Sequence, residues 1–262
     1  MEGEFLSVGP ITIDDTNYQL FIDPVVDGQV MHCTSYGMFQ TGLGDGPTLA
    51  ESGVPLIPES DWDDVIRKRK RHGSTVRELC EDRGLEVLSQ GSTNYCWCNG
   101  VHFAAMVARL QETGQVVRYS PASVAAPIKN FRNRGGWGQE ALDWMIDKGA
   151  NLQEDWPANA IDRRYYNDEN KAKALKHKVL EYYRCRSWKE VGSAILAGWP
   201  VAVGYNWWGH LVCGIDLIEG SHDLVIANSW GKNWSDNGFG ILKGRKKIPD
   251  GESVAITSMT AM

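Results

Sequence analysis

The chain of 262 residues has few cysteines, no long apolar run and no excess of basic charge. The cysteines are too sparse and too irregularly spaced for a disulfide framework, so we expect free thiols in a reducing compartment. The six are Cys33, Cys80, Cys96, Cys98, Cys185 and Cys213. A net charge of −6 excludes a general attraction to nucleic acid or to anionic membranes. The apolar runs are far shorter than a membrane span requires.

The beginning of the chain lacks the features of a secretory signal. Residues 1–4 are acidic and no apolar core follows them, which predicts an intracellular protein without membrane or nucleic-acid partners. What is present is an ordinary globular composition, with 42% hydrophobic and 23% charged residues. The length suits one large domain or two closely packed lobes.

The residue pattern changes near residue 56 and again near Pro200. Residues 1–56 lack helical periodicity and carry short β-type runs, so we expect an extended or small β arm that packs on another surface. Ser60 is expected to cap the first helix of the following domain. Helices are predicted over 60–73, 96–111, 120 onwards, 138–148, 169–183 and 188–197. Short β runs separated by turn residues follow Pro200, which predicts an α+β fold.

The stretch from Gln90 to Trp97 places a cysteine where an apolar helix begins. The positive end of a helix favours a thiolate, so Cys96 is the candidate nucleophile. His210 is the candidate base that forms a thiolate–imidazolium pair with it, and Asn228 would orient the imidazole through its side-chain carbonyl. Gln90 and the backbone N–H of Cys96 are the candidate oxyanion donors. These residue types predict nucleophilic catalysis of acyl transfer.

The same stretches resemble the signatures of the papain-like cysteine peptidase family. Gln90-Gly-Ser-x-x-x-Cys96-Trp97 is similar to the family's cysteine segment, and Gly209-His210 to its histidine segment. Asn228-Ser-Trp-Gly231 is similar to its asparagine block. Weaker similarities include Gly135-Gly136, Trp156-Pro157 and Ile57-Pro58-Glu59, the last resembling the mature N-terminus. The resemblance covers roughly residues 57–262, in the family's order.

The resemblance implies a two-lobed fold and an endopeptidase activity that proceeds through an acyl-enzyme. A helical lobe would span about 62–160 and a β-rich lobe about 161–262, with a polypeptide substrate extended in the cleft between them. The backbone of Gly135 and Gly136 would bind this substrate, and Trp230 would shield the contact between His210 and Asn228 from water. No cofactor and no metal are implied.

Three departures from the family pattern bear on regulation and specificity. Thr93 and Asn133 stand at or next to the positions where the family usually has a disulfide. His210 follows Pro200 by only ten positions, so a loop that usually helps to wall the cleft is missing. Residues 1–56 are too short for the usual inhibitory propeptide, which argues against activation by its removal.

Two alternatives to a peptidase remain open from the sequence. The first is a bacterial or viral assembly subunit, virion-associated or part of another complex, that keeps the fold with reduced or no activity and binds a protein partner through residues 1–56. The second is an acyl-transferring amidase or transpeptidase with the same triad.

Other reactive side chains have a simpler interpretation. Cys98 and His102 share a helix face, but no second ligand pair follows, so packing is favoured over a metal site. Nothing orients the pair His32-Cys33, and the basic run from Arg67 to Arg71 is expected to be a solvated helix end.

Overall fold

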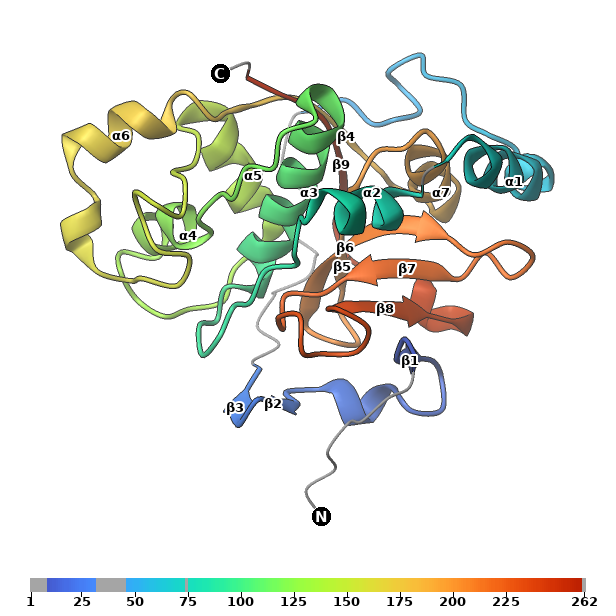
Figure 1. The fold of residues 1–262 in the computed structure, drawn as a ribbon, viewed down its shortest axis with the longest axis horizontal. Helices are drawn as coiled ribbons and strands as arrows, with labels where there is room; N and C mark the ends of the chain where they lie inside the picture. The colour runs from blue at the N-terminus through green and yellow to red at the C-terminus, as the bar shows by residue number, and fades with distance from the viewer. Residues whose placement is uncertain (1–8, 32–45, 74, 261–262) are drawn as a thin grey trace.

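A computed structural model describes residues 9–31, 46–73 and 75–260 of the chain (Figure 1). Its helices are α1 (Trp62–His72), α2 (Val76–Arg83), α3 (Cys96–Thr113), α4 (Ala122–Ile128), α5 (Gly138–Asp147), α6 (Asp168–Ala174) and α7 (Trp188–Leu196). Its strands are β1 (Thr12–Ile13), β2 (Val25–Val26), β3 (Gln29–Val30), β4 (Val179–Arg184), β5 (Val201–Tyr205), β6 (His210–Leu217), β7 (Leu224–Ala227), β8 (Phe239–Leu242) and β9 (Ser253–Met259). The α+β prediction is confirmed.

One sheet carries most of the strands, in the order β1-β8-β7-β6-β5-β9-β4. Neighbours from β8 to β4 pair antiparallel, whereas β1 joins β8 in parallel with Thr12 opposite Ile241. Strands β2 and β3 form a separate hairpin. The N-terminal arm therefore contributes an edge strand, β1, beside β8 (Figure 1), whereas a later part of the arm bridges β4, with Thr48 opposite Arg184.

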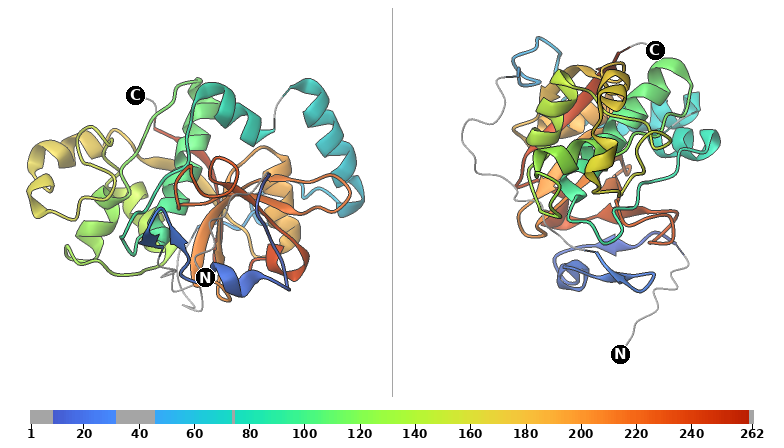
Figure 2. Two further views of the ribbon diagram at one scale, coloured as in Figure 1. Left: turned by 60° about the horizontal axis from the view of Figure 1, so that its bottom comes forward. Right: turned by 90° about the vertical axis from the view of Figure 1, so that its left-hand side faces the viewer.

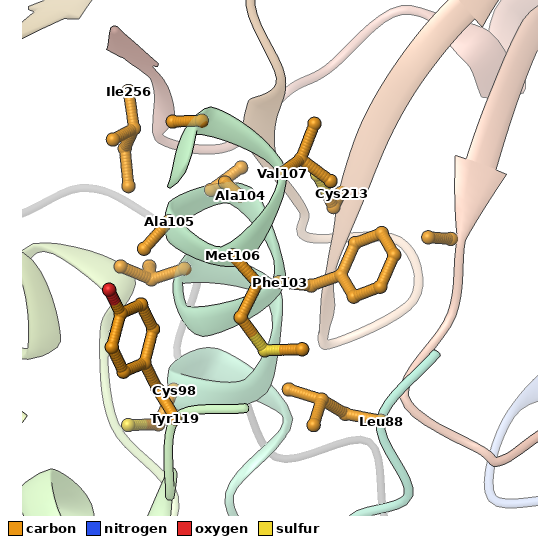
Figure 3. Close-up of a cluster of buried hydrophobic side chains, with 14 of the residues drawn as sticks. Leu88, Cys98, Phe103, Ala104, Ala105, Met106, Val107, Tyr119, Cys213 and Ile256 are labelled. Atoms are coloured by element: carbon orange, nitrogen blue, oxygen red, sulfur yellow. The ribbon is translucent and has the colours of Figure 1, made fainter. Parts of the chain in front are cut away.

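Helix α3 is the centre of the hydrophobic core. Every residue from Cys96 to Leu110 is buried, because α5 packs on one side of the helix and β5, β6 and β9 pack on the other. Figure 3 shows Ala105 on the side of α3 that faces Tyr119 and Ile256 of β9, and Val107 on the side that faces Cys213 of β6. Gly114 ends the helix at a φ of 69°. The helix predicted over 96–111 is confirmed.

The two faces of the sheet bury different clusters, as strand alternation requires. In β6, Leu211 and Cys213 face the α3 cluster, and Val212 belongs to the opposite cluster with α7. Helix α1 packs against α7, with the rings of Trp62 and Trp188 5.9 Å apart. Helices α4, α5 and α6 gather at the other end of the molecule, as both Figure 1 and Figure 2 show.

Two sequence predictions are wrong in detail, and one helix was not predicted. The segment predicted as one helix over 169–183 is α6 followed by β4, because α6 ends at Ala174 and strand pairing to β9 begins at Val179. Ser60 does not cap α1: the N-cap is Asp61, and the Ser60 hydroxyl donates to the Asp61 carboxylate at 2.9 Å. Helix α2 was not predicted, although Thr75 begins it with a capping box.

Two candidate features are not found in the described ranges. No helix there is long and apolar enough to cross a membrane. No group of three or more His, Cys, Asp or Glu side chains in those ranges is arranged to hold a metal ion.

Candidate active site

The first turns of α3 lie against the first residues of β6. Gly100 fixes this contact, because a Cβ at that position would overlap Leu211 Cδ2 and lie 3.2 Å from the backbone oxygens of Leu211 and Val212. A glycine on the fifth residue of α3 thus lets helix and strand approach closely. Cys96 begins that helix and His210 begins that strand, so the fold brings both candidate residues to one end of the helix–strand contact.

The hydrogen bonds of Asn228 determine which nitrogen of His210 carries the proton. Asn228 Oδ1 accepts from the backbone N–H of Ser229 at 2.8 Å, and a backbone N–H can only donate. The same oxygen lies 2.8 Å from His210 Nε2, so in the neutral ring Nε2 is the donor. Nδ1 is left as the basic nitrogen, buried and without a hydrogen-bond partner among the described residues.

Gln90 is held to the asparagine segment from both its backbone and its side chain. Its backbone N–H donates to the Ser229 carbonyl at 2.8 Å, and its Oε1 accepts from the Ser229 hydroxyl at 2.7 Å. Since the amide oxygen is occupied there, Nε2 is directed to the other side, where it donates to the Thr93 carbonyl at 3.0 Å. The structure therefore holds the Gln90 side chain with its Nε2 amide group against the loop that leads to Cys96. Sequence reasoning missed Ser229, which follows Asn228 directly.

Tryptophan rings enclose the imidazole of His210. The ring of Trp230 lies 5.0 Å from it and that of Trp208 4.8 Å from it, measured between centroids. Trp234 packs edge-on against Trp230 at 5.4 Å. Trp230 thus lies where the sequence placed it, beside His210, and its effect on water access stays a prediction.

Cys96 and His210 have no exposed surface in this structure. Burial lowers the pKa of His210 to about 4, against smaller upward effects of the Asn228 hydrogen bond and of the Asp23 charge. The imidazole is therefore neutral at pH 7 in this state. The expected thiolate–imidazolium pair needs a more polar surrounding than the one described here.

The N-terminal arm lies against this aromatic wall. Trp208 Nε1 donates to the Phe21 carbonyl at 2.6 Å, and Asn233 Nδ2 donates to Asp27 Oδ2 at 2.9 Å. The side chains of Phe21 and Met31 are buried in the same cluster as Trp208. No sequence signal pointed to these contacts, because the arm has no periodic pattern and its packing is tertiary.

The glycine pair lies near a hydrogen-bonded clasp in place of the usual disulfide. Asn133 Oδ1 accepts from the Asn94 N–H at 2.6 Å, and Asn133 Nδ2 donates to the Ser92 carbonyl at 3.1 Å. The clasp joins the loop before Cys96 to the segment before Gly135 and Gly136. Both glycines are buried, and nothing in the described residues tests their role in substrate binding.

Cys98 and His102 form a second thiol–imidazole contact on α3. Cys98 Sγ lies 3.4 Å from His102 Nδ1, and both residues are fully buried. Burial raises the pKa of the Cys98 thiol well above its usual value and lowers the pKa of His102 to about 4, so this pair is uncharged at pH 7. His32 and Cys33 lie outside the described residues.

Comparison with known proteins agrees with the observed fold. No protein-family model matches the chain. Cathepsin S of Mus musculus is 25% identical over 246 residues, which cover 80% of this chain and 71% of that protein. Xylellain, a cysteine protease from Xylella fastidiosa, superimposes with a TM-score of 0.56 at 17% identity, over 66% of this chain and 83% of that one.

A Carica candamarcensis cysteine protease, CMS1MS2 in complex with E-64, gives a TM-score of 0.58 at 20% identity. This match covers 71% of this chain and 97% of the other. The solved structures establish an α+β papain-like fold, and the sequence match to cathepsin S extends the similarity over most of the chain. The chain thus shares the papain-like α+β fold of these cysteine proteases, and its sequence is similar to that of cathepsin S over 80% of its length.

Proposed function

We propose that the protein is a cysteine endopeptidase whose nucleophile is Cys96. The Cys96 thiol would give its proton to His210 Nδ1 and attack a peptide carbonyl. The protonated imidazole would then transfer the proton to the leaving amine, and water would hydrolyse the acyl-enzyme. Gln90 Nε2 and the Cys96 backbone N–H would stabilise the oxyanion.

The observation that carries this proposal is the tautomer of His210. Asn228 Oδ1 is fixed by the Ser229 N–H and therefore keeps the proton of the neutral ring on Nε2. A base for the thiol must present an unprotonated nitrogen, and Nδ1 is that nitrogen. An unpartnered nitrogen alone is not distinctive, since His102 Nε2 and His177 Nδ1 also lack partners among the described residues. What distinguishes His210 is the side-chain oxygen of Asn228 that fixes its tautomer.

Access to Cys96 requires part of the chain to move, because neither Cys96 nor His210 is exposed. The arm contacts the wall of the site in two ways: Trp208 Nε1 donates to the Phe21 carbonyl, and the Phe21 side chain is buried in the same cluster as Trp208. We therefore propose that this structure is a closed state and that loosening the arm near Phe21 opens the site. Opening would also remove the burial that keeps His210 neutral.

Thiol labelling with peptide mapping tests the proposal. We expect iodoacetamide, or the epoxide E-64 that the Carica protease binds, to modify Cys96, and the Phe21→Ala variant to react faster than the unchanged chain. Leu20→Ala is the matched control, since Leu20 neighbours Phe21 but is 65% exposed, against 3% for Phe21. A Cys96 that stays unmodified in all three proteins would remove the proposal.

The burial of the site is also what the assembly-subunit alternative requires. A protein that keeps the fold without activity would leave Cys96 inaccessible in every variant and would bind its partner through the arm. Transfer to an added amine, in place of hydrolysis, would instead indicate the amidase or transpeptidase alternative.

A further inference from the structure

The helical end of the molecule carries a small cavity that takes no part in the proposed chemistry. It lies between α4, α5 and α6, with a volume of about 230 Å³. Its walls are the rings of Trp144, Trp156 and Tyr166. Drug-sized ligands occupy pockets of about 300–1,000 Å³, so this cavity is the size of one side chain.

The polar groups on the floor of the cavity already have hydrogen-bond partners and do not require a polar ligand. The Ser123 hydroxyl donates to the Ser120 carbonyl at 2.7 Å and accepts from the Asn151 N–H at 3.0 Å. Asn151 Nδ2 donates to the Asn170 carbonyl at 2.8 Å. Because these buried groups already have partners within the protein, an apolar ring inserted among the aromatic walls would leave none of them unsatisfied.

The rim of the cavity is positively charged. Lys148 Nζ lies 4.2 Å from the centroid of the Trp144 ring, and Lys171 Nζ lies 4.5 Å from that of Tyr166. Among the described residues no carboxylate pairs with Lys148, and none lines the cavity. Lys171 pairs with Asp168 at 3.0 Å, but that carboxylate is fully exposed and the pair is easily exchanged.

We propose that this cavity binds an aromatic side chain of a polypeptide that carries carboxylates on either side of it. The ring would fill the space between Trp144, Trp156 and Tyr166, and the flanking carboxylates would meet Lys148 and Lys171 at the rim. The half-exposed Leu175 at the same rim, 53% accessible, adds apolar area beside the entering ring. The inference does not depend on the chemistry of Cys96.

The experiment measures peptide binding by calorimetry at low salt. The full chain with Cys96→Ala, which prevents turnover, is titrated with the peptide Gly-Glu-Tyr-Asp-Gly blocked at both ends. Two control peptides replace the tyrosine by alanine or both acids by lysine. We expect the first peptide to bind, both controls to bind more weakly, and added salt to weaken the first.

Charge reversal at the rim provides the decisive comparison. Lys148→Glu should weaken binding of the tyrosine peptide about tenfold, which corresponds to one lost charge-assisted contact. Lys68→Glu makes the same charge change on exposed α1, at the opposite end of the molecule, and should leave binding unchanged (Figure 1). The proposal would be overturned if the two charge-reversal variants bound the tyrosine peptide with equal affinity. It would also be overturned if the peptide did not bind to the Cys96→Ala chain that carries neither charge reversal.

Discussion

The two hydrogen bonds of Asn228 Oδ1 make a sharp prediction for the variant Asn228→Ala. The substitution leaves two buried donors, His210 Nε2–H and the Ser229 N–H, without their acceptor. Each buried donor that loses its partner costs about 1–3 kcal/mol, so we expect the free energy of unfolding to fall by about 2–6 kcal/mol. The imidazole also loses the group that fixes its tautomer, and hydrolysis of a fluorogenic peptide should fall about 10²-fold.

The variant Asn99→Ala provides a matched control. Asn99 is equally buried on α3, but its side chain only donates to the Tyr95 carbonyl, at 2.8 Å, and that carbonyl also accepts from the backbone N–H groups of Cys98 and Asn99. We expect a loss of about 1 kcal/mol or less and little change in hydrolysis. Urea unfolding and initial rates measure both variants. Equal losses in the two would refute the role given to Asn228.

Three further predictions follow from the same structure. Gly100→Ala should lower the free energy of unfolding, measured in urea, by about 1–3 kcal/mol. The overlap of the new methyl group with Leu211 outweighs the gain in helix propensity of about 1 kcal/mol. An increase in the free energy of unfolding would contradict the close contact of α3 with β6. Asn133→Ala should lower the midpoint of thermal unfolding and make the loop before Cys96 more sensitive to proteases, because two hydrogen bonds of the clasp are lost. An unchanged midpoint would show that the clasp does not stabilise the fold. The difference in the free energy of unfolding between the natural chain and His102→Phe should become less favourable to the natural chain by up to about 3 kcal/mol as pH falls from about 6.5 to 4. Burial lowers the pKa of His102 to about 4, so in this range only the unfolded chain takes up the proton. A difference that grew in favour of the natural chain at acid pH would contradict this sign.

The centre of the fold was predictable because its signals are local. The apolar run from Cys96 and the glycine at 114 mark both ends of α3, and turn residues separate the strands after Pro200. The order of Gln90, Cys96, His210 and Asn228 pointed to one site. In the structure His210 is hydrogen-bonded to Asn228, and Gln90 is hydrogen-bonded to Ser229 beside it, while the chemical roles of these residues stay predictions.

The features that could not be predicted from the sequence depend on tertiary contacts. Strand β1 has two residues and forms only because β8 offers its edge, so no local pattern announces it. The helix predicted through residue 183 fails because β4 pairs with β9, and that pairing overrides a helix-favouring run of lysines before Val179. The clasp of Asn133 and the contact of Phe21 with Trp208 depend on groups far apart in the chain.

The most direct measurement is the rate at which each cysteine of the folded chain reacts with iodoacetamide, followed by peptide mapping, with and without Phe21→Ala. The account predicts that Cys96 reacts faster than the buried thiols Cys80, Cys98 and Cys213, whose pKa values burial raises, and that Phe21→Ala accelerates only Cys96. Equal and slow reaction of all four cysteines, unchanged by the substitution, would contradict it.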